Sequence, residues 1–513
     1  MRRADGTRHK LALVDQVGLT ARARRHWLFG LVLAAALVLR ILVALAFRPI
    51  MWFGGDSASY LATGLRLIPD PARVGGYGFM LWVLRPLHSF ALVAAVQHLM
   101  GLAMGVLIYL LARRYGLPAW AATLATVPVL FDAYELQLES DALPDIPFAF
   151  LVVLAVYLLL RSPGERRPAP TAAAAFLLGV SALLWPVGLV LLGVLLVVLL
   201  TALLIRRAGL VTVLAALLAG ALPVAAYSAW FSIHRHQFSL TRSDGVYLWS
   251  RTMSFADCAV IRPPAAERPL CPPPGPRIAA SLYIWNANSP VLAMPTGRFS
   301  ARTNHLALHF ALRAIAAQPG GYAAAVGHDF ALSFFWDRPV HPDAAIVDRY
   351  QFADATTAWV PATLWTPGGG TLAGDQAAYN NGRPAPTRAV QPYASWLVTY
   401  QRYVYLRGTL LGVILLAGLA GMVLRRRFSG PGLPWAFAVT ILLVPPLVAD
   451  FDLRYLVPAV PVACLAAALA FAPGAGQRRW TTSPAATATS EPEDTRTSSL
   501  PSESTPATGP DSA

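Results

Sequence analysis

The chain has 513 residues, of which 56% are hydrophobic and only 13% are charged. A soluble protein would carry about twice that share of charged residues, so the composition excludes an ordinary soluble enzyme and indicates a polytopic membrane protein. The net charge of +15 does not indicate a nucleic-acid partner, because the basic residues cluster at the ends of apolar runs, the pattern that determines membrane topology.

Apolar stretches long enough to cross a bilayer recur along the chain. They begin at Trp27, Phe90, Leu117, Leu143, Thr171, Pro186, Ala208, Tyr403, Leu433 and Tyr455. The run 171–205 would be about 52 Å long as one helix, too long for an ordinary span, and Pro186 suits the first turn of a new helix. We therefore expect a break at Trp185-Pro186. The predicted fold is all-α and polytopic, with about ten transmembrane helices.

Arginine clusters indicate how these spans are oriented. They lie at 22–25, 113–114, 161–167, 206–207, 425–427 and 478–479, and one orientation places all of them in the cytoplasm. We therefore predict a multi-pass protein of the plasma membrane with both termini cytoplasmic. In this orientation the loops 48–89, 132–145 and 230–402 are external and carry most of the acidic residues.

This topology divides the chain into five predicted parts. They are a cytoplasmic N-terminal segment (1–26), a transmembrane core (27–229), an external soluble domain with mixed loop structure (230–402), C-terminal transmembrane helices (403–472) and a cytoplasmic tail (473–513). The tail is rich in Ser, Thr, Pro, Ala and acids. Such a composition does not form a core, so we expect the tail to be disordered.

The first external loop begins with FGGDSASYL, at residues 53–61. Gly54-Gly55 permits a sharp backbone turn, and residues 57–68 can form a short interfacial helix that turns Tyr60 toward lipid or protein. Asp56 would then be the N-cap of this helix. A carboxylate at the bilayer edge is also well placed to act as a base. The two roles are compatible.

Five acids follow in the second external loop, FDAYELQLESDALPDIPF. Asp132 and Glu135 are expected to lie in a solvated loop. Glu139 and Asp141 lie where the fourth span begins, so desolvation would raise their pKa values or recruit a cation. They could bind Mg²⁺, Mn²⁺ or Ca²⁺ together with Asp56, or they could bind sugar hydroxyls. The sequence leaves both possibilities, and the cofactor, open.

The external domain has enough aromatic residues to bury a small core of its own. Residues 301–317 and 322–336 are predicted helices, separated by the stop signal QPGG. Cys258 and Cys271 both lie in this domain, in an oxidising space. A disulfide between them is therefore expected, with two free thiols as the alternative.

Several polar residues lie at or within the spans. Arg454, in DFDLRYLVP, sits at the outer interface, where its guanidinium could bind a phosphate through two hydrogen bonds or serve as an anchor beside Tyr455. Arg40 lies inside the first span and must pair with a partner, either for structure or with a lipid phosphate. His98, in the second span, is either a packed core residue or part of the site.

The order of these motifs resembles that of the GT-C membrane glycosyltransferases. The resemblance is carried by an external Asp followed by SASYL, by QHLMGLAMGVLIYLLARR, by LESDALPDIPFAFLVVLAVYLLLR and by RYLVPAVP. It covers residues 27–230 well and 450–462 locally. The most similar groups are the protein mannosyltransferases that use dolichyl-phosphate-mannose and the aminoarabinose transferases. FADC and LCPPP in the large loop resemble actinobacterial relatives.

The resemblance implies a transferase that moves a sugar from a polyprenyl-phosphate donor to an external acceptor, which is a glycan, a lipid or a protein, with inversion at the sugar carbon. It implies that Asp56 takes the proton from the acceptor hydroxyl, and that Glu139 or Asp141 is a second acidic site. Arg454 is the candidate that steadies the lipid phosphate. Many relatives have Arg-Pro where this chain has Trp185-Pro186, so one phosphate contact is absent here.

Two other functions stay open at this point. A transporter or flippase for a lipid-linked substrate would need polar residues along several spans, whereas the spans here are almost purely aliphatic. A non-catalytic membrane scaffold would tolerate the loss of Asp56. Neither the sugar nor the acceptor follows from the sequence.

Overall fold

The computed structural model describes residues 5–161, 167–355 and 361–473, with side chains from His26 onward. The predicted tail 473–513 lies outside these residues except for Pro473. The side chains of the predicted N-terminal segment also lie outside them, apart from that of His26. The backbone of this segment from Asp5 onward continues into the first membrane helix as part of α1 (Asp5–Ala46).

Five helical runs within the described residues are long and apolar enough to cross a membrane. They are α1 over His26–Ala46, α4 (Phe90–Arg114), α10 (Val187–Leu204), α11 (Leu210–Arg235), and Leu453–Phe471, which ends in α22 (Val460–Phe471). Three further apolar helices are shorter: α8 (Asp145–Leu160), α9 (Pro168–Leu184) and α21 (Gly432–Val448). Another candidate is bent by 54° between α19 (Tyr393–Tyr403) and α20 (Gly408–Leu424). The protein is thus a mostly helical, multi-pass membrane protein, and the number of ten spans stays a prediction.

The break expected at Trp185-Pro186 is confirmed, since α9 ends at Leu184 and α10 begins at Val187. Close packing of α9 on α11 depends on glycine. A Cβ atom on Gly179 would lie 2.3 Å from the carbonyl oxygen of Gly220. No larger residue fits at this crossing without moving one of the two helices.

The stretch that begins at Leu117 is not one continuous helix. It forms α5 (Ala119–Leu124) and α6 (Val127–Phe131), after which α7 (Ala133–Ser140) follows. Pro128 lacks the N–H group that a continuous helix would bond to the carbonyl of Leu124. The predicted third span is therefore broken in two.

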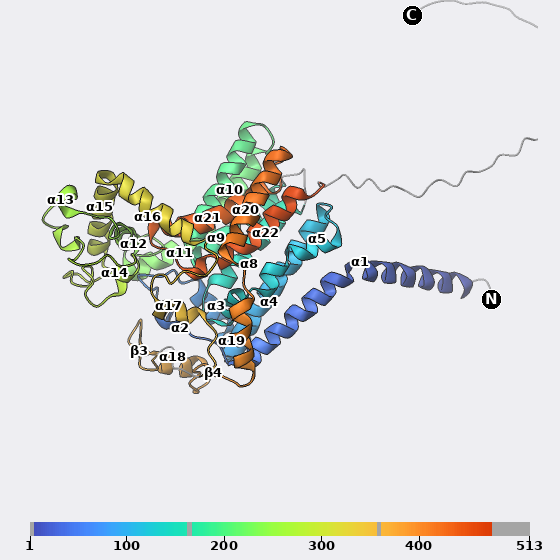
Figure 1. Cartoon of the computed structure of the whole chain (residues 1–513), viewed down its shortest axis with the longest axis horizontal. Helices are drawn as coiled ribbons and strands as arrows, with labels where there is room; N and C mark the ends of the chain where they lie inside the picture. Colours follow the sequence, from blue (N-terminus) through green and yellow to red (C-terminus); the bar gives the residue numbers. More distant parts are fainter. Residues whose placement is uncertain (1–4, 162–166, 356–360, 474–513) are drawn as a thin grey trace, which may run out of the picture. The chain divides into compact units, whose positions relative to one another are not determined.

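A second group of helices follows α11 and lies beside the bundle (Figure 1). It contains α12 (Asp244–Thr252), α13 (Cys258–Ile261), η2 (Arg268–Leu270), α14 (Leu282–Trp285), α15 (Ala301–Ala317) and α16 (Pro319–Leu332). Its core is separate from that of the bundle and includes the fully buried Trp249 and Phe310. The structure joins Cys258 to Cys271 by a disulfide, as expected.

The helix predicted at 301–317 is confirmed as α15, but the next helix begins at Pro319 rather than at residue 322. Gln318 both ends α15 and precedes α16. Proline is favoured in the first turn of a helix, where its missing N–H is not needed. QPGG therefore stops one helix and starts the next within a single residue.

The chain returns to the bundle through short elements. They are α17 (Ala344–Val347), η3 (Asp348–Tyr350), the β2–β3 hairpin (Trp365–Thr366 with Gly370–Thr371), α18 (Leu372–Tyr379) and β4 (Arg388–Ala389). β4 pairs antiparallel with β1 (Phe47–Arg48), directly after the first span. The large loop is thereby tied to the residues that precede Gly54.

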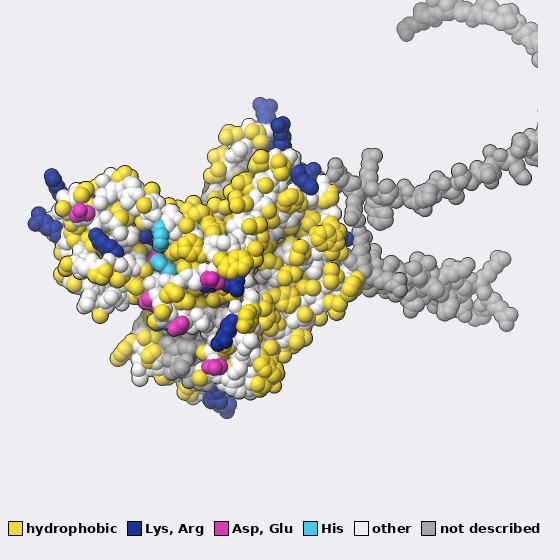
Figure 2. Space-filling view, viewed as in Figure 1, with side chains coloured by type: hydrophobic (Ala, Val, Ile, Leu, Met, Phe, Trp, Pro, Cys, Tyr) yellow, Lys and Arg dark blue, Asp and Glu magenta, His cyan; other side chains and the backbone are white. Residues whose placement is uncertain are grey.

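Figure 2 shows hydrophobic side chains over much of the visible face of the helix bundle. Exposed apolar residues on α10 and α11 include Leu204, Leu218 and Ile233. A water-soluble protein rarely exposes so broad an apolar face. The surface suits contact with lipid.

Candidate functional site

Asp56 lies in the first turn of α2 (Gly54–Arg66). The predicted N-cap role is wrong, because the helix begins two residues earlier, at Gly54, whose φ is +46°. At this helix start, the N–H of Phe53 donates to Ser57 Oγ at 2.8 Å. The helix dipole favours a carboxylate in the first turn, and the Asp56 side chain remains available to other partners.

Two arginines from distant parts of the chain bind the Asp56 carboxylate. Arg73 Nε donates to Oδ1 at 2.7 Å, and Arg454 Nη1 donates to Oδ2 at 2.9 Å. The exposed fraction of the side chain is 17% for Asp56, 17% for Arg73 and 14% for Arg454. The cluster is therefore partly desolvated but still reachable from outside the protein.

Arg73 is held by the turn that follows α2. Asp70 accepts hydrogen bonds from the N–H groups of Ala72 (2.7 Å) and Arg73 (3.0 Å), and Ser59 donates to its other oxygen. Carboxylates commonly stabilise turns in this way. The Arg73 guanidinium also lies over the ring of Trp285, 4.9 Å from its centroid.

Arg454 is held from several sides in η4 (Leu453–Tyr455). Its guanidinium lies 5.5 Å from the ring centroid of Phe53 and 5.4 Å from that of Tyr455. Its Nε is 3.9 Å from Asp145 Oδ1. These contacts hold the guanidinium beside Asp56, to which it donates one hydrogen bond; a planar guanidinium can also bind a phosphate through two hydrogen bonds.

The two guanidiniums determine the protonation of Asp56. Burial by itself would raise the pKa of this carboxyl, but the positive charges of Arg73 and Arg454, with their hydrogen bonds, hold the pKa below its usual value. Asp56 is therefore ionised at neutral pH. Burial lowers the pKa of Arg73, but the charge of Asp56 outweighs this effect and raises it.

Glu139 has a different environment, inside the bundle. Its Oε1 accepts from Arg40 Nη2 at 2.6 Å, and its Oε2 lies 2.7 Å from His98 Nδ1. Arg40 also donates to the carbonyl oxygens of Ala36 (3.2 Å) and Leu130 (3.0 Å). The structure thus brings Arg40, His98 and Glu139 together and occupies both carboxylate oxygens of Glu139.

Space for this triad comes from Gly101 on α4. A Cβ atom there would lie 1.8 Å from Glu139 Oε1. Glu139 is fully buried and Arg40 is only 1% exposed. Glu139 is therefore the buried counter-charge that Arg40 was expected to have within the span.

Asp141 is also buried and joins the second acidic loop to the segment that follows the first span. Met51 forms a parallel bridge with it, and the Met51 N–H donates to the carbonyl of Ser140 at 2.8 Å. Gln137 Nε2 donates to Asp141 Oδ2 at 2.6 Å. Burial raises the pKa of Asp141 well above its usual value, although the Gln137 hydrogen bond opposes the shift.

Asp132 and Glu135 do not lie in a solvated loop, contrary to expectation. Asp132 is 5% exposed and caps α7 by accepting from the N–H groups of Tyr134 (2.7 Å) and Glu135 (3.2 Å). Glu135 is 1% exposed. Burial raises the pKa values of both carboxyls. The prediction failed because α7 and the segment before α20 fold over these residues, and the N–H of Leu406 reaches Asp132 Oδ2 at 2.7 Å.

Tyr60 and Tyr455 both lie near the arginine–aspartate cluster. Tyr60 is buried one helical turn after Asp56 and packs edge-on against Tyr77. Tyr455 stacks on Trp185, with ring centroids 4.8 Å apart. Trp185 thus supports the residue next to Arg454.

Sequence reasoning missed two residues that lie at Asp56 or Arg454. Arg73 is in the same loop as Asp56, between the first two spans, but nothing in its spacing marks it as a partner. Asp145, rather than Glu139 or Asp141, is the acid of the second loop that faces Arg454, and its Oδ2 is buried without a hydrogen-bond partner among the described residues. Its position at the start of the apolar helix α8 was the feature of the sequence that could have indicated this role.

The expected metal ligands Asp56, Glu139 and Asp141 are not grouped in the structure. Among the residues that the structure describes, the one set of three potential ligands within 4.8 Å of one another is Asp329, His341 and Asp450. The hydrogen-bond partners of Asp56 are two arginines, whose positive charges repel a cation. A divalent ion at Asp56 is therefore not supported by this geometry.

Comparison with known proteins gives a family match over part of the chain. Residues 86–239 match the model of the family described as dolichyl-phosphate-mannose-protein mannosyltransferase. No curated protein sequence is similar to the chain at a significant level.

Three solved structures match the chain at low similarity. The protein O-mannosyltransferase complex of S. cerevisiae, bound to its sugar donor, is 17% identical with a TM-score of 0.29, over 44% of this chain and 36% of that one. ArnT from Cupriavidus metallidurans, bound to undecaprenyl phosphate, is 15% identical with a TM-score of 0.34, over 86% and 77%. The oligosaccharyltransferase AglB from Archaeoglobus fulgidus is 14% identical with a TM-score of 0.37, over 87% and 50%.

The chain thus spans about a third of the length of the first of these proteins and half of the length of the third. The matched segment 86–239 runs from η1 (Arg85–Leu87), just before α4, to just past the end of α11, and it includes the whole second acidic loop. Over this segment the predicted resemblance to the GT-C membrane glycosyltransferases, and to their protein mannosyltransferase family in particular, is confirmed.

Proposed function

We propose that the protein is a membrane glycosyltransferase that moves a sugar from a polyprenyl-phosphate donor to a hydroxyl group of an external glycan, lipid or protein. The observation that carries the proposal is the cluster of Asp56, Arg73 and Arg454. An ionised carboxylate and two guanidiniums lie together, partly exposed, at the end of the first span. A base and phosphate-binding groups are the two parts that this transfer requires.

The reaction breaks the bond between the sugar carbon and the phosphate oxygen and forms a bond from that carbon to the acceptor oxygen. Asp56 accepts the proton that the acceptor hydroxyl loses. The electron pair of the broken bond stays on the phosphate, whose added charge Arg454 and Arg73 stabilise. Attack from the face opposite the phosphate inverts the sugar carbon.

Donor binding would also activate the base. In the free protein the arginines hold the pKa of Asp56 low, which makes it ionised but weakly basic. A phosphate that draws Arg454 and Arg73 toward itself weakens their hold on Asp56. The pKa of Asp56 then rises, and its power to accept a proton increases only when a donor is present.

The acceptor side of the cluster is formed by Trp285 and Arg298. Trp285 is 40% exposed and is contacted by Arg73 and by Arg298, whose guanidinium lies 5.2 Å from the ring centroid. Arg298 makes no ion pair with any described residue, and its Nε is buried without a partner among them. An aromatic face beside an unpaired guanidinium suits a polar or anionic saccharide.

A transporter is the second candidate, because the Arg40–Glu139–His98 triad places charges inside the bundle. Intramembrane charges often mark a transport path. In this structure, however, the triad is closed: Glu139 is fully buried, and the His98 side chain is 8% exposed. The side chains of Asp56, Arg73 and Arg454 are instead partly exposed, which favours transfer over transport.

The test is transfer by purified full-length protein from a panel of radiolabelled polyprenyl-phosphate sugars. Asp56→Asn should lower turnover by about 10²–10⁴-fold, the usual loss for a general base. Its binding of unlabelled polyprenyl phosphate should be at least as tight as in the wild type, because both arginines lose their competing carboxylate. Arg454→Ala should weaken that binding.

Arg407→Ala is the matched control for the loss of an arginine, because Arg407 is also partly buried but pairs with the exposed Asp337, away from Asp56. It should leave both binding and turnover near wild-type values. A folded Asp56→Asn protein that transfers sugar at the wild-type rate would disprove the proposed role of Asp56. If no donor of the panel is used by the wild type, and the Arg454→Ala variant binds polyprenyl phosphate as the wild type does, the function itself is wrong.

A further inference from the structure

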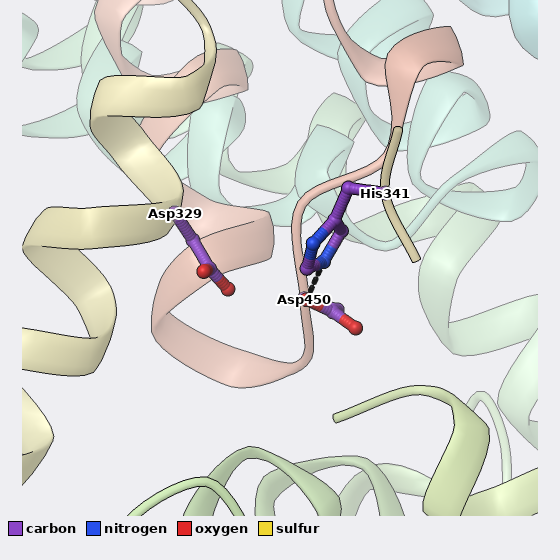
Figure 3. A group of neighbouring side chains, drawn as sticks. All are labelled: Asp329, His341 and Asp450. Atoms are coloured by element: carbon purple, nitrogen blue, oxygen red, sulfur yellow. Dashed lines mark hydrogen bonds and ion pairs between the residues drawn. The ribbon is translucent and has the colours of Figure 1, made fainter. Parts of the chain in front are cut away.

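A compact group of metal-binding side chains lies apart from Asp56, where three segments of the chain meet (Figure 3). Asp329 belongs to α16, and His341 to the segment that follows it. Asp450 lies between α21 and η4. In Figure 3 the Asp329 carboxylate points toward the His341–Asp450 pair.

The three ligand atoms are close enough to converge on a single ion after side-chain rotations. One ligand atom from each residue lies within 4.8 Å of the others, and His341 Nε2 is 2.6 Å from Asp450 Oδ1. Zinc is tetrahedral and binds nitrogen and carboxylate oxygen at about 2.0–2.2 Å, so neighbouring ligand atoms lie about 3.3–3.6 Å apart. The widest gap must therefore close by about 1.2–1.5 Å and the shortest must widen by about 0.7–1.0 Å, movements within the reach of side-chain rotations.

The ligands are held by a second layer of hydrogen bonds. Asp450 Oδ2 accepts from the N–H of Ser281 at 2.9 Å and from its Oγ at 3.0 Å, and Asp450 Oδ1 accepts from the N–H of Phe451 at 2.9 Å. Arg251 binds Asp329 Oδ2, which leaves Oδ1 facing only the exposed His328 at 3.0 Å. Such outer partners orient metal ligands in known sites.

The charges of the group also need a partner. Asp329 and Asp450 are both 3% exposed and so carry two negative charges in a desolvated place. Arg251 compensates one of them. The carboxylate of Asp450 contacts His341, and a cation bound between the two carboxylates would be attracted by both negative charges.

We propose that Asp329, His341 and Asp450 form a site for one divalent transition-metal ion, with Zn²⁺ preferred. One imidazole nitrogen and two carboxylate oxygens suit Zn²⁺ better than Mg²⁺ or Ca²⁺, which prefer oxygen ligands alone. Water completes the coordination. The ion ties α16 to the segment that leads into η4 and Arg454, and this inference does not depend on the proposed function.

The experiment measures metal in the full-length protein purified in detergent without chelators. Mass spectrometry of the metal content should find about one zinc per chain. After removal of metal with EDTA, Zn²⁺ should rebind with higher affinity than Mn²⁺, and Mg²⁺ should not compete. His341→Gln and Asp329→Asn each remove a ligand. Loss of an outer partner weakens metal binding by about 10–100-fold. Each of these two substitutions removes a ligand and should weaken Zn²⁺ binding by more than that.

His305 and His309 provide the matched control, since they form an exposed pair of histidines on α15 whose Nε2 atoms are 3.1 Å apart. Substituting both by Gln should leave zinc content and affinity unchanged. If this double variant loses the metal and His341→Gln keeps it, the ion sits at the surface pair and the proposal is wrong. Wild-type protein that binds no Zn²⁺ after metal removal would equally overturn it.

Asp329→Asn leaves Arg251 without its charged partner, so this substitution should also destabilise the fold. His341→Gln avoids this, because Gln can still donate a hydrogen bond to Asp450. Thermal unfolding provides the second measurement: Zn²⁺ should raise the unfolding temperature of the wild type and of the His305/His309 variant, but not that of His341→Gln. An equal rise in all three would refute the site.

Discussion

Replacing Glu139 by Gln tests whether this acid serves structure or reaction. The change keeps the shape of the side chain and removes its charge. Arg40 would keep its hydrogen bonds to two backbone carbonyls but would lose its counter-charge, although it is only 1% exposed. Removing one partner of a buried ion pair costs about 3–5 kcal/mol. That cost corresponds to a change of about a hundredfold to a few thousandfold in the folding equilibrium.

The assay is unfolding of the purified protein in mild detergent by added SDS, followed by tryptophan fluorescence. The double variant Arg40→Met/Glu139→Gln is the control, because it removes both charges. It should recover most of the lost stability, since an apolar replacement of a buried pair is often neutral or stabilising. Turnover of the folded Glu139→Gln protein should stay within a few-fold of the wild type. If Glu139→Gln is as stable as the wild type but transfers sugar a hundredfold more slowly, Glu139 is a reacting acid and our assignment is wrong.

Three further predictions concern other parts of the molecule. Replacing Cys258 and Cys271 by Ser should destabilise the helical region around α12–α16 by about 3 kcal/mol, the loop-closure value for a bridge across 13 residues; mass spectrometry of non-reduced peptides should show the bridge, and two free thiols would contradict it. Because the folded-state pKa of Asp56 is lowered, its stabilising effect is complete above pH about 4, the unfolded value, and is lost as pH falls through the folded pKa; the stability difference between wild type and Asp56→Asn should thus be constant from pH 5 to 8, and a change in that range would refute the shift. A membrane-impermeant thiol reagent on intact cells should label a cysteine placed at Ser300 but not one at Ser490, and the reverse pattern would invert the topology.

Local features of the fold could be read from the sequence. The break at Trp185-Pro186, the helix at 301–317 and the disulfide all follow from short-range signals: a proline at a helix start, a Pro-Gly stop and two cysteines in one loop. The resemblance over residues 86–239 also rests on the order of motifs along the chain. Such signals depend on backbone chemistry within a few residues.

Helix boundaries were less certain where two signals overlapped. The glycines of FGGD indicate a turn, but they became the first residues of α2, and this moved Asp56 from the cap into the first turn. Pro128 interrupted a stretch whose apolar character alone predicted one span. Hydrophobicity determines that a segment is buried, but not whether its hydrogen bonds run unbroken.

The partners of the charged residues were decided only by tertiary structure. Arg40 and Glu139 are 99 residues apart, and Arg454 and Asp56 are 398 apart. The sequence requires that Arg40, within its span, finds a counter-charge, but several acids of the second loop satisfy that requirement equally well. Which of them pairs with it depends on how α1, α4 and α7 pack, and close packing at Gly101 leaves room for the Glu139 carboxylate beside Arg40. Ion pairing falls off over a few ångströms, so the packing of the helices, rather than the pattern of residues, selects each pair.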